Sequence, residues 1–282
     1  MQGVTYVAGA TGFLGSALSH HLASQGRDLL VSAGNGTRLR KLTEAITLKN
    51  PHINVSSFIC DLSKPDTWKD VSSSVKGRYI ENYINCAGVQ GKLGLNSEIS
   101  YEEMAHVFNV NLFSSIFFTN LFAKSLQPNE KLSIIHFSGG GAAGKRPFFM
   151  PYSLSKTSLL RFVENFAAEN LNENLKINAI APGVMPSRMQ KEVIDNVSLR
   201  KTKDYSVAEL SLSSNDFNFS KILNLCDFLI SNTSQGVTGK LISAEWDNWS
   251  QWPNHLRELE SSDLYTLRRI TGRDRGYGWG DL

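Results

Sequence analysis

The sequence is poor in the features that mark secreted, membrane-spanning and metal-binding proteins. Its three cysteines, Cys60, Cys86 and Cys226, form no Cys-x-x-Cys pair, which argues against a disulfide framework and a zinc knuckle. The six histidines include no His-Glu-x-x-His pattern, so we expect no metal site. No apolar run is long enough to cross a bilayer and no signal-peptide pattern is present, so we expect no membrane span and a cytoplasmic location.

A strong charge of either sign is also lacking. The net charge is +3, which does not by itself indicate nucleic acid binding, and we expect no nucleic acid partner. Basic residues gather only near the end, where Arg268, Arg269, Arg273 and Arg275 lie close together. Two interpretations of this cluster remain open: a solvated basic tail, and a site for phosphate or another polyanion.

The chain does contain enough apolar sequence to bury a core, with 41% hydrophobic residues. From residue 3 to about 245, short β-rich runs alternate with amphipathic segments of helical length, which is typical of a parallel sheet covered on both faces. The pattern predicts a three-layer α/β/α Rossmann fold with a doubly wound, seven-stranded parallel sheet. The expected strands are 4–9, 28–33, 53–60, 79–85, 131–138, 175–182 and 239–245.

Two segments interrupt this alternation. Residues 184–215 are polar and too long for an ordinary connection, so we expect a lid over a substrate site. Residues 249–282 form a basic tail that is too aromatic for simple disorder, and we expect it to pack on the body or on a partner subunit. The sequence therefore divides into a Rossmann-fold domain, 1–248, and a C-terminal tail, 249–282.

A glycine-rich turn follows the first expected strand. Glycines recur at three-residue intervals where that strand gives way to a helix, in "AGATGFLGSAL". A pyrophosphate binds to backbone N–H groups at a helix N-terminus, and glycine lets it approach closely. We expect this turn to bind a dinucleotide through Gly9, Thr11, Gly12, Phe13, Leu14 and Gly15.

The end of the second strand bears on the choice of cofactor. An acidic residue there would bind the ribose 2′-hydroxyl and repel a 2′-phosphate, but "VSAGNGTRLRK" contains none. Arg38 and Arg40 follow, where a guanidinium could meet a phosphate. This pattern favours NADP(H) and leaves NAD(H) open, and an exposed helical Arg38 without a ligand is the alternative.

Tyr152 and Lys156 lie a helical turn apart in "PYSLSKTSLL". A free tyrosine has a pKa near 10, and an adjacent ammonium favours the phenolate and lowers that pKa. The pair is therefore a candidate proton donor.

With this pair in view, the sequence resembles the short-chain dehydrogenases/reductases over about residues 3 to 245. The matching motifs are the glycine loop, Tyr152 with Lys156, Asp61 and Leu62 after the third strand, Asn85, Ala87 and Gly88 after the fourth, Asn111 in "NVNL", and "APGVMPS" with Pro182, Gly183, Val184 and Ser187. The resemblance implies that these residues bind NAD(P)(H), apart from Asn111, which matches a catalytic asparagine.

The resemblance also implies roles for the reacting groups. Tyr152 would protonate a substrate carbonyl, Lys156 would lower its pKa and hold the nicotinamide ribose, Ser138 would orient the carbonyl, and Asn111 would support a proton relay. Ser138 stands one residue before the usual position of the serine, which Gly139 occupies.

The sequence gives less information about the substrate and the oligomeric state than about the cofactor site. The "GKLISAEWDNW" ending and the arginine-rich tail are similar to members of bacterial polysaccharide and sugar-nucleotide pathways, which suggests a nucleotide-linked keto-sugar. The alternatives are a small unphosphorylated ketone or acyl thioester, and a non-catalytic protein that senses NADP(H) or acts as a scaffold. Helical segments 111–126 and 158–171 are apolar on more than one face, so we expect a homodimer or homotetramer.

Overall fold

A single parallel sheet forms the centre of the computed structural model, which describes residues 3–170, 174–213 and 217–279. The strand order is β3-β2-β1-β4-β5-β6-β7, and every pairing is parallel. The strands are β1 (Val4–Ala8), β2 (Leu29–Ala33), β3 (Val55–Ile59), β4 (Ile80–Asn85), β5 (Leu132–Phe137), β6 (Leu175–Ala181) and β7 (Leu241–Ser243). The predicted seven-stranded Rossmann fold is confirmed.

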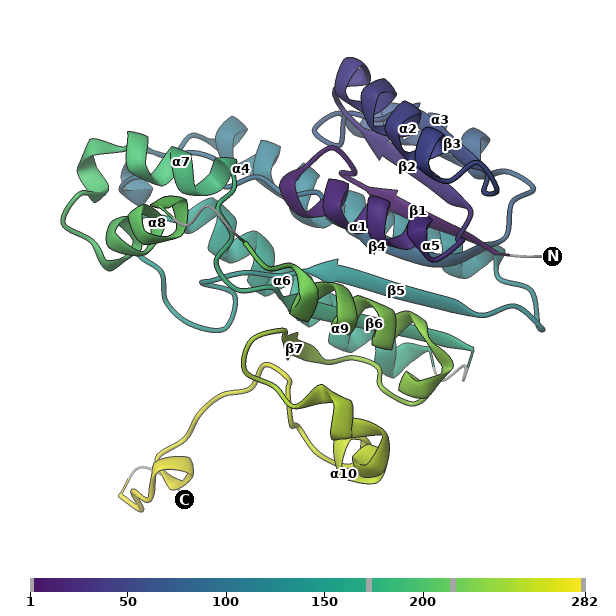
Figure 1. The fold of residues 1–282 in the computed structure, drawn as a ribbon. Coiled ribbons are helices and arrows are strands. Elements are labelled where there is room, and N and C mark those ends of the chain that lie inside the picture. Colours follow the sequence, from purple (N-terminus) through teal and green to yellow (C-terminus); the bar gives the residue numbers. More distant parts are fainter. Residues whose placement is uncertain (1–2, 171–173, 214–216, 280–282) are drawn as a thin grey trace.

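Two helical layers cover the sheet (Figure 1). On one face, α1 (Phe13–Ser24), α2 (Gly36–Lys49) and α9 (Ser220–Ile230) share one apolar core with the strands. On the other face, α3 (Trp68–Val75), α5 (Ser114–Ser125) and α6 (Met150–Glu169) share a second core. The inner strands β2 and β5 are buried at every residue and mostly apolar, whereas the edge strand β3 is partly exposed.

The strand order places a crevice at the middle of the sheet. The chain runs outward from β1 through β2 to β3, and then returns to place β4 on the other side of β1. The loops after β1 and β4 therefore diverge at the carboxyl ends of these strands, which is where open α/β sheets bind ligands.

The segment expected to be a lid contains two helices, α7 (Arg188–Asp195) and α8 (Lys203–Ser213), which lie with α4 (Tyr101–Phe108) beyond the carboxyl ends of the strands (Figure 1). A small apolar cluster joins them to the body, made of Phe149, Val193, Leu199 and Ala208. The movement of this segment as a lid stays a prediction, and its residues 214 and 215 lie outside the described part of the chain.

The tail packs along the free side of β7. After a short α10 (Leu256–Glu260), the carbonyl oxygen of Tyr265 accepts a hydrogen bond of 2.8 Å from the Leu241 N–H. The rings of Trp252 and Tyr265 lie 4.2 Å apart, and the backbone of Leu267 is bound by Glu164 of α6. The tail thus contacts the same protein's body, as one of the two alternatives predicted.

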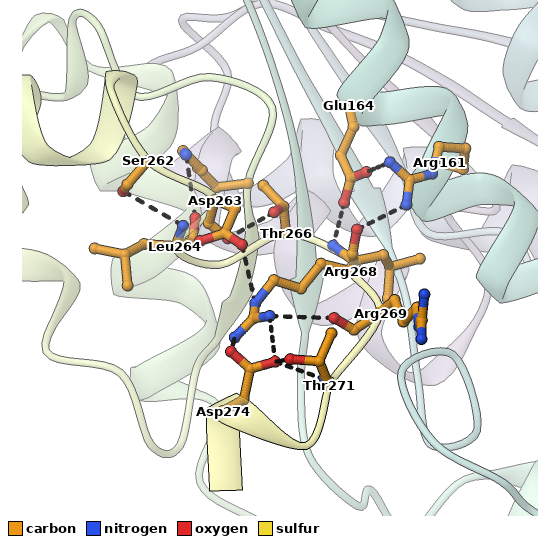
Figure 2. Close-up of polar contacts among 12 residues, drawn as sticks. Arg161, Glu164, Ser262, Asp263, Leu264, Thr266, Arg268, Arg269, Thr271 and Asp274 are labelled. Atoms are coloured by element: carbon orange, nitrogen blue, oxygen red, sulfur yellow. Dashed lines mark hydrogen bonds and ion pairs between the residues drawn. The ribbon is translucent and has the colours of Figure 1, made fainter. Parts of the chain in front are cut away.

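The arginine cluster of the tail is partly neutralised by its own neighbours. Figure 2 shows the Arg268 guanidinium between two carboxylates, with 2.9 Å to an oxygen of Asp263 and 2.9 Å to one of Asp274. The same view shows Arg161 paired with Glu164 on α6. These pairs favour the interpretation of the cluster as a solvated tail with internal ion pairs.

Within residues 3–170, 174–213 and 217–279, no helix combines the length and apolar character needed to cross a membrane. The same described residues contain no group of three or more His, Cys, Asp or Glu side chains placed to hold a metal ion.

Candidate active site

Tyr152 and Lys156 lie in the first two turns of α6, with side chains directed into the crevice. Both are buried, at 7% and 3% exposure. The Lys156 ammonium donates a hydrogen bond of 2.7 Å to the carbonyl oxygen of Phe137, the last residue of β5, and lies 5.9 Å from the centre of the Tyr152 ring. This hydrogen bond fixes the ammonium at the carboxyl end of β5.

Asn111 links α6 to the loop after β4. It lies in a π-helical turn (Asn109–Phe113) between α4 and α5, a distortion often found at functional sites. Its Oδ1 accepts from the Val89 N–H at 2.9 Å, and its Nδ2 donates to the Val89 carbonyl and to Ser155 Oγ at 2.9 Å each. Because Ser155 belongs to α6, Asn111 holds the helix in register with this loop.

The serine that the motifs predicted to assist Tyr152 forms no hydrogen bond to it. Ser138 is buried, and its Oγ has no hydrogen-bond partner among the described residues, so this hydroxyl is available to a ligand. The Tyr152 hydroxyl instead lies against Gly139, where a Cβ would overlap it and would come within 3.0 Å of the ring carbon Cζ. Glycine at 139 is therefore required by the position of the phenol, and the role of Ser138 stays a prediction.

Burial controls the protonation of this pair. It raises the pKa of Tyr152, and the charge that opposes this rise is the guanidinium of Arg146. Burial also lowers the pKa of Lys156 from 10.5 to about 8, so the ammonium is charged below that pH. The structure differs here from the sequence expectation, because burial of the phenol outweighs any lowering of its pKa by Lys156.

A cavity of about 1190 Å³ runs along the carboxyl ends of the strands. Most of the predicted site residues line it. They are Gly9, Thr11, Gly12, Phe13, Leu14, Arg38, Asp61, Leu62, Ala87, Gly88, Ser138, Tyr152, Lys156, Pro182, Gly183, Val184 and Ser187.

Three predicted residues lie behind the wall of the cavity. Gly15 packs so closely on the phosphate loop that a Cβ there would overlap the carbonyl oxygen of Gly9. Asn85 donates to Ser115 Oγ at 2.8 Å, and Asn111 is occupied by the contacts described above. Gly15 and Asn85 thus support the cavity wall, and their expected contact with the cofactor stays a prediction, as does the role of Asn111.

The cavity is also lined by residues that no motif indicated. Asn35 caps α2 by accepting from the Arg38 N–H at 2.9 Å, and Gln90 donates to the Met189 carbonyl of the lid at 2.9 Å. Arg146, Lys203 and Asp204 line its lid end. For Asn35 the sequence held one signal, its position two residues after the end of β2, whereas the others depend on contacts between distant segments.

The cavity fits a dinucleotide. The N-terminus of α1 has no side-chain cap, so its first N–H groups are free to bind a pyrophosphate, and Gly12 at this position lines the cavity. Arg38 lines the wall beside β2, and no acidic residue lines the cavity next to it from 32 to 38. Lys156 and Tyr152 line the same cavity.

This arrangement defines an α/β nucleotide-binding fold with a tyrosine–lysine site at the crevice. The family model for short chain dehydrogenases matches residues 3–198. The chain belongs to the short-chain dehydrogenase/reductase family.

Curated relatives agree with this assignment. The chain is 23% identical over 187 residues to mouse "Dehydrogenase/reductase SDR family member 4", an alignment that covers 66% of each chain. It is 24% identical over 252 residues to the "Diacetyl reductase [(S)-acetoin forming]" of Staphylococcus epidermidis, covering 86% of this chain and 96% of the relative.

Solved structures share the fold. YwfH, described as an NADPH-dependent reductase involved in bacilysin biosynthesis, superposes with a TM-score of 0.75 at 22% identity, covering 86% of this chain and 97% of that one. The actinorhodin polyketide ketoreductase with NADPH gives 0.74 at 19% identity, covering 86% and 95%.

Proposed function

We propose that the protein is an NADPH-dependent reductase of a substrate carbonyl. The observation that carries the proposal is that Tyr152, Lys156 and Ser138 line the same cavity as the phosphate loop and Arg38. Relatives named as a diacetyl reductase and an NADPH-dependent reductase support it. NADPH is preferred to NADH in the proposal because Arg38 offers a cation to a 2′-phosphate and no carboxylate at the end of β2 opposes it.

The protein's own groups account for the proton and for positioning. The nicotinamide, when bound, supplies the hydride to the carbonyl carbon. The Tyr152 hydroxyl donates its proton to the carbonyl oxygen, so that the C=O becomes a CH–OH, and Ser138 Oγ hydrogen bonds to that oxygen and orients it. Lys156 binds the ribose hydroxyls, and Asn111 holds the Val89 loop through which a water path can resupply the proton.

Two substrate classes follow from different features. A nucleotide-linked keto-sugar follows from the resemblance of the C-terminal region, but no described residue of the tail lines the cavity and Arg268 is already paired with two carboxylates. A small ketone or acyl thioester is favoured by the relatives named as a diacetyl reductase and a polyketide ketoreductase. We also propose that the enzyme is cytoplasmic and that it forms a homo-oligomer.

A spectrophotometric screen tests the function. NADPH and NADH oxidation are followed with nucleotide-linked keto-sugars, diketones and acyl thioesters, using Tyr152→Phe as the matched control that keeps the ring and removes the hydroxyl. We expect turnover with NADPH and a loss of about 10²–10⁴-fold in the variant. Tight NADPH binding without any turnover would support the non-catalytic alternative.

A further inference from the structure

Arg146, on the loop between β5 and α6, is fixed at the lid end of the cavity. Its Nε donates a hydrogen bond of 2.7 Å to Asp204 Oδ1 on α8, and its Cζ lies 3.6 Å above the ring centre of Phe149. Phe149 is fully buried beneath the two lid helices. The guanidinium therefore has one defined position, although no motif marks this residue.

The two Nη groups of Arg146 remain available to a ligand. They make no hydrogen bond to any residue in the described part of the chain, and Asp204 engages only Nε. A planar guanidinium with two free N–H edges is well suited to bind a carboxylate or a phosphate. An arginine whose only role was to hold the lid in place would be expected to bind Asp204 through its Nη groups.

The guanidinium is also close to the reacting group. The Tyr152 hydroxyl lies against Gly139, and Arg146 Nη1 lies 3.8 Å from the position of a Cβ on the next residue, Gly140. Successive Cα atoms are about 3.8 Å apart, so phenol and guanidinium lie beside neighbouring residues of one loop. The charge of Arg146 also acts on Tyr152, as its effect on the pKa of the phenol indicates.

The charges around the cavity favour an anionic ligand. Six lysine or arginine side chains line it against two carboxylates, those of Asp61 and Asp204. Arg38 and Lys156 have cofactor roles in the proposed function. The remaining four, Lys145, Arg146, Arg188 and Lys203, stand near the lid. Arg188 is paired there with Glu192 of α7 at 3.0 Å and Arg146 with Asp204 of α8 at 2.7 Å, so the lysines add positive charge beyond these two pairs.

We propose that Arg146 binds an anionic group, a carboxylate or a phosphate, that the substrate carries within a few bonds of its carbonyl. The inference rests on the proposed carbonyl reduction and names the substrate class for that same site. Asp204 and Phe149 hold the guanidinium, and its Nη groups receive the anion while the carbonyl oxygen meets Tyr152. Arg146 is thus a specificity-determining residue, and α8 is linked to substrate binding through Asp204.

Matched pairs of compounds test this assignment. Acetoacetate is compared with its methyl ester, and dihydroxyacetone phosphate with dihydroxyacetone, in kcat/KM with NADPH. The same compounds are titrated calorimetrically into Tyr152→Phe loaded with NADP⁺, which reports binding without turnover. The first pair tests a carboxylate and the second a phosphate.

We expect at least one anionic member to be preferred over its neutral partner by about tenfold or more, the effect of one charged hydrogen-bond pair. Arg146→Gln abolishes this preference, mainly through KM, and Arg146→Lys restores part of it. Asp204→Asn retains the preference, because the amide oxygen can still accept from Nε and hold the guanidinium, while Nη1 and Nη2 stay available. Arg200→Gln, the same substitution at an exposed lid residue outside the cavity, is the matched control.

Three outcomes overturn the inference. In the first, neutral members bind and react as well as the anionic ones. In the second, no anionic member binds more tightly than its neutral partner to the loaded Tyr152→Phe protein. In the third, Arg146→Gln and Asp204→Asn each lower the activity on the anionic and on the neutral compound by the same factor. Arg146 would then only hold the lid in place. Unchanged turnover in Tyr152→Phe would instead contradict the proposed function itself.

Discussion

The hydroxyl of Tyr152 lies where a side chain on residue 139 would begin. A Cβ on Gly139 would overlap this oxygen, so the phenol and the loop approach each other as closely as glycine allows. The site thus depends on the absence of a side chain at the position where the family usually has its serine.

Gly139→Ala should therefore damage catalysis by displacing the phenol. A displacement of about 1 Å from the productive geometry can cost roughly 10²-fold in rate, and we expect kcat with NADPH to fall by about that factor. Gly144→Ala is the control, because a Cβ there meets nothing within 4 Å. If kcat is unaffected by Gly139→Ala, the Tyr152 position described here is not the reactive one.

Lys156→Met should stabilise the protein while removing activity. The fall in the Lys156 pKa from 10.5 to about 8 corresponds to a cost of about 3 kcal/mol in folding, and loss of the hydrogen bond to Phe137 offsets about 1–2 kcal/mol of it. Denaturant unfolding at pH 7 without cofactor should show a net gain of about 1–2 kcal/mol.

The pH dependence of this difference gives an internal check. Between pH 8 and 10.5 the unfolded chain binds more protons at Lys156 than the folded protein does, so this residue makes the wild-type unfolding free energy rise with pH. The variant lacks that contribution, and its advantage should shrink in this window. A variant less stable than wild type at pH 7 would contradict the prediction.

The rate of reduction should fall as the pH rises through about 8. Lys156 loses its charge there, whereas Tyr152 stays protonated because burial raises its pKa. Since kcat/KM for NADPH reports the free enzyme, its pH profile should be flat below about 8 and decline above it. Lys156→Arg, which keeps its charge, should move the decline upward, and a profile identical to wild type would assign the titration elsewhere.

Cofactor preference should depend on Arg38 and not on Arg40. Arg38 lines the cavity and Arg40 does not, although both are exposed on α2. We expect Arg38→Ala to raise KM for NADPH about tenfold while changing KM for NADH little, since one charge-assisted contact to a 2′-phosphate is lost. If Arg40→Ala changes KM for NADPH as much as Arg38→Ala does, the cavity wall at Arg38 is not the site of the 2′-phosphate.

Assembly should use the apolar stripe that runs from the end of the π-helical turn along α5. Phe113, 47% exposed, is followed at four-residue spacing by the partly exposed Phe117 and Leu121. Sedimentation velocity at micromolar concentration should give a dimer or tetramer, and Phe113→Arg should reduce its size. Leu48→Arg, at an exposed apolar position on α2, is the control; a monomeric wild type would refute the prediction.

Much of this architecture follows from sequence pattern alone. Apolar runs at regular spacing predicted every strand, because strands covered by helices on both faces are mostly apolar. Motif order likewise predicted that Tyr152 and Lys156 would line one cavity with the glycine loop. Motifs do not give side-chain direction, however, and Asn85 and Asn111 therefore lie behind the cavity wall although both were matched to functional positions.

Arg146 shows the other limit of prediction from sequence. Its position depends on Asp204, 58 residues further along the chain, and on the packing of Phe149 under the lid helices. Neither contact leaves a local pattern, because each joins segments that only the folded chain brings together. The helices α7 and α8 were also missed as helices, since the polar segment that forms them buries few apolar residues.

The last strand of the sheet has no free edge. The outward N–H of Leu241 is taken by Tyr265 of the tail, and that of Ser243 by the Asp247 carboxylate at 2.7 Å. An open strand edge is a template on which another chain can pair and aggregate. Asp247 and the tail thus cover the β7 edge of the sheet within one chain, so what looks in the sequence like an appendage keeps a foreign strand from pairing with that edge.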